Sequence, residues 1–182
     1  GESLEPCRLA LAEKHKEDPA YVMGYVPDCD GDRGNIVIYD EVADTFRILA
    51  AQEVFALCVV AELAQLEWDR RYTAKDVSKP IAVVVNDPTS FIVKEICDAF
   101  GAELYVAEVG EACVVGKARE VRSQGKIVRI LGEGSAGGNI TFPSSVRDPI
   151  DTVFALLKLL AVKETGHTKG LFQLWCEKSH QE

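Results

Sequence analysis

The residues of this chain best suited to chemistry stand together at positions 28–33. Carboxylates occupy alternate positions and an arginine follows the last of them: Asp28, Asp30, Asp32 and Arg33. Carboxylates this close together repel one another unless a cation lies among them, and hard oxygen ligands of this kind suit Mg²⁺ or Ca²⁺. An arginine can hold a phosphate through two parallel hydrogen bonds. A divalent metal beside a phosphate-binding arginine indicates phosphoryl transfer.

Other interpretations of this acidic segment are weaker. An EF-hand loop also opens with alternating aspartates, but it needs a glycine where Arg33 stands and a glutamate where Tyr39 stands. A phosphatase of the haloacid-dehalogenase kind needs a D-x-D-x-T/V motif, and no threonine or valine stands at the required place. A solvated acidic turn between two strands is a further alternative, because Asp and Gly are common in turns, but it leaves the alternation unexplained.

A glycine-rich segment at residues 132–139 is the second candidate. It contains G-x-G-x-x-G after an expected strand, but a dinucleotide site needs a helix to begin there. Residues 139–142 instead indicate a short strand, followed by a proline. No Gly-Lys-Ser/Thr ends the segment, and Glu133 stands where a nucleophile elbow needs its first glycine. A flexible turn between two strands and a binding loop both stay open.

The binding interpretation depends on Glu133 and Ser135. They stand two positions apart, so in an extended segment their side chains point the same way. A carboxylate and a hydroxyl together can hold two neighbouring sugar hydroxyls. We therefore expect a sugar clamp at these residues.

The elements that must position these residues alternate along the chain. Near-continuous apolar strands that alternate with helices predict an α/β fold, with a mixed, mostly parallel sheet and helices on both faces. The expected strands are residues 81–85, 104–107, 126–131 and 139–142, and the expected helices are residues 52–68, 90–100, 110–123 and 149–163.

The first forty residues have a different pattern. One helix and two strands are expected there, at residues 7–16, 21–26 and 36–39, and these elements cannot enclose a core alone. We expect residues 1–42 to be the end of a partial preceding α/β domain, residues 43–163 to form the sheet domain, and residues 164–182 to be a tail or linker. The chain begins with glycine and its only methionine is Met23, so we expect a processed product or an expressed fragment.

Composition excludes several classes of protein. The chain has 182 residues, 47% of them hydrophobic, and a net charge of −9. This charge disfavours nucleic acid and anionic membranes as partners, and no apolar run reaches the roughly 18 residues that span a bilayer. The six cysteines form no C-x-x-C pair, so we expect a reduced, cytoplasmic location. The three histidines lie too far apart to form a zinc site.

The segment D-x-D-G-D-R after a strand resembles the metal-binding signature of the α-D-phosphohexomutases, the superfamily of phosphoglucomutases and phosphomannomutases. The usual signature has a glycine where this chain has Cys29. The resemblance implies that Asp28, Asp30 and Asp32 hold Mg²⁺. It implies that Arg33 contacts the phosphate of the enzyme's phosphoserine or of the sugar.

The glycine-rich segment is similar to the G-E-x-S-G-H loop in the third domain of that family. Glu133 and Ser135 match it, which implies a role in substrate binding. The chain then departs from the pattern, because Ala136 is an extra residue and Gly138 or Asn139 stands where the family has histidine.

Two more segments fit the same resemblance. Gly110 and Glu111 match the turn before a helix that lies near the substrate in this family. Residues 147–150, with the sequence R-D-P-I, resemble the family's R-D-G-I at the start of a helix, and a proline suits a first helical turn.

The resemblance implies an isomerase that interconverts hexose 1-phosphate and hexose 6-phosphate through a phosphoserine and a bisphosphate intermediate. The family's T-A-S-H-N-P and R-x-S-G-T-E-P loops are absent from this sequence. We therefore expect the chain to be the end of domain 2 plus domain 3, to need the remaining domains of its polypeptide, and to be inactive alone. A stand-alone module that binds a sugar phosphate or a metal, and a purely structural domain, stay open as alternatives.

Overall fold

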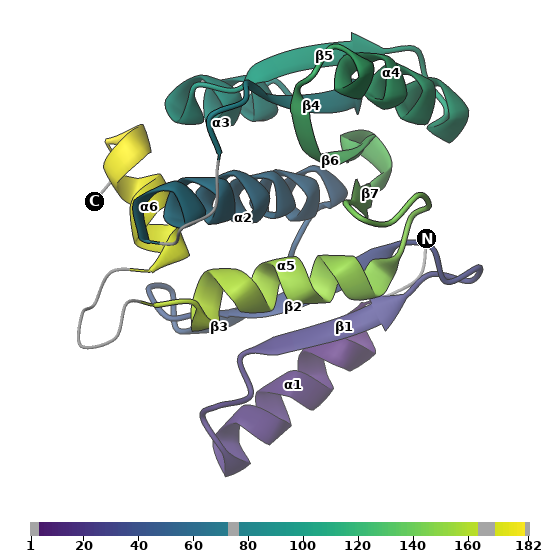
Figure 1. The fold of residues 1–182 in the computed structure, drawn as a ribbon. Coiled ribbons are helices and arrows are strands. Elements are labelled where there is room, and N and C mark those ends of the chain that lie inside the picture. Colours follow the sequence, from purple (N-terminus) through teal and green to yellow (C-terminus); the bar gives the residue numbers. More distant parts are fainter. Residues whose placement is uncertain (1–3, 73–76, 164–169, 181–182) are drawn as a thin grey trace.

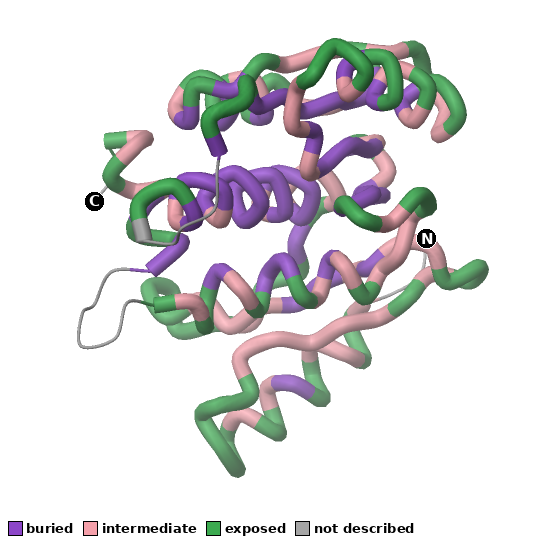
Figure 2. Tube along the Cα trace, viewed as in Figure 1, coloured by how far each residue is buried: buried purple, intermediate pink, exposed green. Residues whose placement is uncertain are grey.

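The computed structural model describes residues 4–72, 77–163 and 170–180, which build two sheets on either side of one long helix (Figure 1). This helix, α2 (Ala51–Tyr72), carries apolar residues nearly all round its surface, as a helix covered on several sides requires. Figure 2 shows that it is buried along most of its length. Both sheets are thereby fixed against one common element.

The larger sheet has the strand order β5-β4-β6-β7. The central strand β4 (Ile81–Asn86) pairs in parallel with β5 (Glu103–Ala107) and β6 (Ile127–Glu133), and β7 (Gly138–Thr141) pairs antiparallel with β6. Helices α2 and α3 (Ile92–Phe100) cover one face, and α4 (Glu111–Ser123) covers the other. The predicted α/β class, with a mixed, mostly parallel sheet and helices on both faces, is confirmed.

The alternation along β4 explains why this strand is apolar throughout. Val83 and Val85 join the core on the α2 side, whereas Ala82 and Val84 join the core under α4. Every residue of β4 is buried, as expected of a parallel strand covered on both faces. The polar residue Asn86 ends the strand and begins the loops that build the candidate site.

The smaller sheet is antiparallel, with the order β1-β2-β3. Its strands are β1 (Met23–Pro27), β2 (Gly34–Asp40) and β3 (Thr45–Ile48), and helix α1 (Glu5–Glu17) packs on one face. The sequence did not predict β3, which has only four residues and is mostly exposed. The other face contributes Ile36 to the same buried cluster as α2 and β4. The first forty residues therefore share a core with the rest of the chain.

The last two helices pack against α2. Helix α5 (Pro149–Ala161) begins as expected, with the Asp148 side chain accepting from Ile150 N at 2.9 Å and with Pro149 in its first turn. The expectation of a tail or linker after residue 163 is wrong for residues 171–179, which form helix α6 (Leu171–Ser179). Leu171 and Leu174 are buried in the core cluster of α2, and this packing, rather than a strong local pattern, stabilises the helix.

Part of the expected tail, residues 164–169 and 181–182, lies outside the described residues. Among the helices that the structure describes, none is both long enough and apolar enough to cross a membrane.

Candidate active site

The acidic segment forms the loop between β1 and β2. The strand pairing closes at Pro27 opposite Gly34, so all of the residues between them lie in this loop. One carboxylate oxygen from each of Asp28, Asp30 and Asp32 lies within 4.8 Å of the others. The hairpin therefore brings together the acids that the sequence singled out.

The loop folds back on Asp28. Its Oδ1 accepts the backbone N–H of Asp32 at 3.0 Å and of Arg33 at 3.1 Å, and its Oδ2 accepts from Nε of Arg33. Gly31 has a φ of 72°, a conformation that favours glycine at this turn. Burial raises the pKa of Asp28, but the hydrogen bonds and charge of Arg33, together with the hydrogen bond from Asp32 N–H, outweigh burial and leave the pKa below its usual value. Asp28 is therefore held as a carboxylate.

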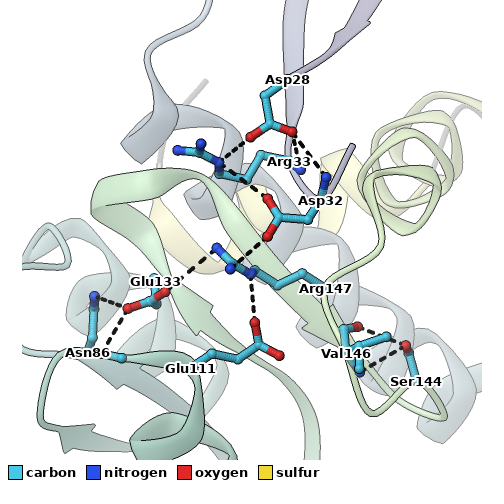
Figure 3. Close-up of polar contacts among 10 residues, drawn as sticks. Asp28, Asp32, Arg33, Asn86, Glu111, Glu133, Ser144, Val146 and Arg147 are labelled. Carbon is cyan, nitrogen blue, oxygen red and sulfur yellow. Dashed lines mark hydrogen bonds and ion pairs between the residues drawn. The ribbon is translucent and has the colours of Figure 1, made fainter. Parts of the chain in front are cut away.

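Arg33 lies between two carboxylates of the loop (Figure 3). Its Nε, which bonds Asp28, is 3.4 Å from Oδ1 of Asp32. The hydrogen bond to Asp28 raises the pKa of Arg33 above its usual value. Oδ1 of Asp32 is buried and has no hydrogen bond within the described part of the chain, because the contact with Arg33 is an ion pair without hydrogen-bond geometry.

The donor set of the loop fits a divalent cation. A buried carboxylate oxygen without a hydrogen bond costs free energy, and a metal ligand role removes that cost. The exposed Asp30 and the partly buried Asp28 and Asp32 supply hard oxygen atoms within 4.8 Å of one another, which suits Mg²⁺.

Arg147, just before α5, connects this loop to the rest of the site (Figure 3). Its Nη2 is 2.7 Å from Oδ2 of Asp32, its Nε donates to Oε2 of Glu111 at 2.8 Å, and its Nη1 is 3.8 Å from Oε2 of Glu133. The side chain is only 22% exposed, so these pairs are partly shielded from water and salt. One guanidinium thus joins the acidic loop, the start of α4 and the end of β6.

The local sequence places Arg147 well. The cap of α5 by Asp148 fixes the backbone beside it, and Gly138 leaves room for its side chain, since a Cβ on Gly138 would lie 2.6 Å from Cδ of Arg147. The sequence singled out residues 147–150 but predicted no role for Arg147. Its position before a helix cap was the available signal, and nothing in the sequence indicates that it reaches Asp32.

Glu133 lies at the end of β6 and is held from two sides. Its Oε1 accepts from Nδ2 of Asn86 at 3.1 Å and from the backbone N–H of Gly110 at 3.0 Å. Gly110 has a φ of 121° and directly precedes α4, whose first residue is Glu111. The structure thus brings Glu133, Gly110 and Glu111 together, and Arg147 connects these residues to the acidic loop.

The geometry expected for Ser135 is wrong, because the segment is not extended there. Residues Gly134–Ala136 form a 3₁₀ turn, which closes at Gly137 with a φ of 70°. The backbone N–H of Gly134 donates to Oγ1 of Thr89 at 3.0 Å, which pins the turn to the loop after β4. Ser135 is exposed, whereas Glu133 is largely buried. The two side chains therefore do not share one face of a strand.

The glycine-rich segment forms a closely packed turn between β6 and β7. A Cβ on Gly132 would meet the carbonyl oxygen of Gly138 at 2.2 Å, and one on Gly134 would meet Oε1 of Gln52 at 2.7 Å. Asn139 is buried, donates to Oγ1 of Thr141 at 3.1 Å and accepts from Oγ1 of Thr152. Neither Gly138 nor Asn139 presents a side chain toward a ligand in the way that a histidine could.

Comparison with known proteins assigns most of the chain to a family. The sequence model of the phosphoglucomutase/phosphomannomutase alpha/beta/alpha domain III matches residues 54–177. A search of curated protein sequences found no match.

Solved structures share the fold at low sequence identity. One is a phosphomannomutase from Thermus thermophilus, with 21% identity, a TM-score of 0.56, and coverage of 98% of this chain and 35% of that one. Another is the phosphoprotein pp63/parafusin, a phosphoglucomutase from Paramecium, with 20% identity, a TM-score of 0.61, and coverage of 98% and 29%.

An N-acetylglucosamine-phosphate mutase of the α-D-phosphohexomutase superfamily matches with 16% identity, a TM-score of 0.53, and coverage of 74% and 31%. This chain therefore spans about a third of the length of these relatives.

Proposed function

The chain belongs to the phosphoglucomutase/phosphomannomutase family through its domain III, and we propose that it is part of an enzyme that interconverts hexose 1-phosphate and hexose 6-phosphate. The proposal includes a phosphoserine donor and a bisphosphate intermediate. The loops for the phosphoserine and for the distal phosphate are absent from this sequence. The remaining domains of the polypeptide would supply them.

One observation carries the proposal, namely the continuous set of ion pairs from the acidic loop to Glu133 (Figure 3). The charges alternate along this set, and its ion-pair contacts are no longer than 3.8 Å. Its members are, in order, Asp28, Arg33, Asp32, Arg147 and Glu133. This arrangement supports the proposal, because it would bring the metal ligands and the sugar-binding carboxylate beside one another. Binding of a phosphorylated sugar would use the metal for the phosphate and the carboxylate for the sugar hydroxyls.

The acidic loop would provide the metal site of this enzyme. Asp28, Asp30 and Asp32 would hold Mg²⁺, and Arg33 would move from the carboxylates to a phosphate, which its guanidinium matches with two hydrogen bonds. When bound, the metal would neutralise charge on the transferring phosphoryl group.

The residues around Arg147 would bind the sugar. Glu133, held in place by Asn86 and Gly110, would accept hydrogen bonds from sugar hydroxyls, and the exposed Ser135 would contact the ring from the turn beyond it. Glu111, which is 35% exposed, would lie near the substrate at the start of α4. In this arrangement residues 1–42 would be the end of domain 2, and residues 43–163, which include the larger sheet, would belong to domain 3.

Because other domains would supply the phosphoserine loop and the distal phosphate loop, we expect the isolated chain to have no mutase activity. Conversion of glucose 1-phosphate to glucose 6-phosphate with Mg²⁺ should be at background for residues 1–182 and measurable for the intact polypeptide. Turnover by the isolated chain would contradict the prediction, because no phosphoserine loop is present. Absence of turnover with glucose, mannose and glucosamine phosphates in the intact polypeptide would contradict the proposed activity.

A further inference from the structure

Arg147 is the shared partner of side chains from different parts of the candidate site. Asp32 comes from the loop between β1 and β2, Glu111 from the start of α4, and Glu133 from the end of β6. Each of these carboxylates faces a different nitrogen of the guanidinium. A lysine could not do this, because an ammonium is a point charge without the planar fork.

The geometry at Asp32 separates the roles of its two oxygens. Oδ2 is 2.7 Å from Nη2 of Arg147, whereas the buried Oδ1 has no hydrogen bond within the described residues. Arg147 thus fixes the carboxylate by one oxygen. The other oxygen, which is 3.4 Å from Nε of Arg33, would turn to a cation when Arg33 moves to a phosphate. Groups that hold a ligating carboxylate in this way commonly change metal affinity by about 10- to 100-fold when they are removed.

On this basis we propose that Arg147 is a positioning residue that couples the metal loop to the sugar-binding residues. Through Arg147, a cation bound at Asp32 changes the environment of Glu133 and so the affinity for the sugar. By linkage, a bound sugar changes the affinity for the metal by the same factor. The inference rests on the proposed function, since it assumes that the acidic loop binds Mg²⁺.

The coupling can be followed at single backbone amides. The N–H groups of Asp32 and Arg33 donate to Asp28 and report on the metal loop. The N–H of Gly110 donates to Oε1 of Glu133 at 3.0 Å and reports on the sugar side. A Mg²⁺ titration of the ¹⁵N-labelled chain, monitored by amide chemical shifts, reads both ends of the connection without any assay of activity.

The test compares the wild-type chain with Arg147→Met. In the wild-type chain, Mg²⁺ should shift the amides of Asp32, Arg33 and Gly110 with one dissociation constant. In Arg147→Met this constant should rise at least about tenfold, and the amide of Gly110 should stop responding. Arg47→Met removes an exposed arginine paired with Glu53 and should leave both readouts unchanged.

The outcomes separate this inference from the proposed function. If the amides of Asp32 and Arg33 do not respond in the wild-type chain, the metal proposal fails. If they respond but the amide of Gly110 is silent, or if Arg147→Met behaves like the wild-type chain, only the coupling inference is overturned. Should Arg147→Met fail to fold, Arg147→Lys carries the test, since it keeps the charge and should still lose the response of Gly110.

Discussion

At the scale of single residues, arginines organise the acidic loop. Arg33 bonds Asp28 and approaches Asp32 to 3.4 Å, and Arg147 holds the other oxygen of Asp32. Asp30 differs from its neighbours in the loop, because it is exposed whereas Asp28 and Asp32 are partly buried. The fold therefore does not depend on Asp30, which makes it the clearest probe of a metal site.

Replacement of Asp30 by asparagine should remove a metal ligand without disturbing the fold. In the intact enzyme we expect Asp30→Asn to lower Mg²⁺-dependent turnover at least about a hundredfold, while the melting temperature of the isolated chain stays at its wild-type value. Glu95→Gln, which neutralises an exposed acid on α3, is the control. Wild-type turnover in Asp30→Asn would remove the metal interpretation of the loop.

At the scale of elements, a buried acid connects α2 with two of its neighbours. Glu62 of α2 is 2% exposed, lies 3.1 Å from Nη2 of Arg129 on β6, and pairs with Nζ of Lys158 on α5. Removal of one member of a buried ion pair usually costs more than the pair contributes, because the remaining charges stay buried. Glu62 therefore holds β6 and α5, and with them Glu133 and Arg147, in their relative positions.

The substitution Glu62→Gln should lower the stability of the chain. Arg129 and Lys158 are 31% and 21% exposed, so water compensates part of the loss, and we expect a decrease of about 2–3 kcal/mol in the free energy of unfolding. Urea unfolding measures it. The control is Glu120→Gln, which breaks an exposed pair with Lys117 and should cost less than about 0.5 kcal/mol. Equal midpoints for the two variants would contradict the structural role of Glu62.

At the scale of the whole molecule, one buried cluster joins both sheets. Ile36 of β2, Val83 of β4 and Leu174 of α6 belong to the same cluster, and α2 lies at its centre. The proposed boundary between the end of domain 2 and domain 3 therefore crosses a packed interface. This interface is apolar, and it joins the sheet that carries the acidic loop to the sheet that carries Glu133.

The reactivity of the cysteine thiols tests whether this core is packed as described. Burial raises the pKa of Cys58 on α2 and of Cys97 on α3 to about 12, so both stay protonated at pH 8 and unreactive. Cys113 on α4 is exposed. Iodoacetamide at pH 8 should modify Cys113 in the folded chain, and Cys58 and Cys97 only in denaturant, as measured by peptide mass spectrometry. Equal rates for Cys58 and Cys113 in the folded chain would contradict the packing of α2.

The sequence alone determined the features that depend on neighbouring residues. The near-continuous apolar strands predicted the covered sheet, and Pro149 predicted the start of α5. The alternating acids predicted the loop in which Asp28, Asp30 and Asp32 meet. Each of these signals lies within a few positions of the chain, where backbone geometry and hydrogen bonding restrict the possibilities.

Only the tertiary structure decided the contacts between distant segments. Helix α6 has a buried face only because α2 covers it, and the turn at Ser135 forms because Gly134 is bonded to Thr89. The contact of Arg147 with Asp32 depends on how α5 packs beside the β1–β2 loop. Such contacts arise from long-range packing, which overrides local preference and leaves no periodic signal in the sequence.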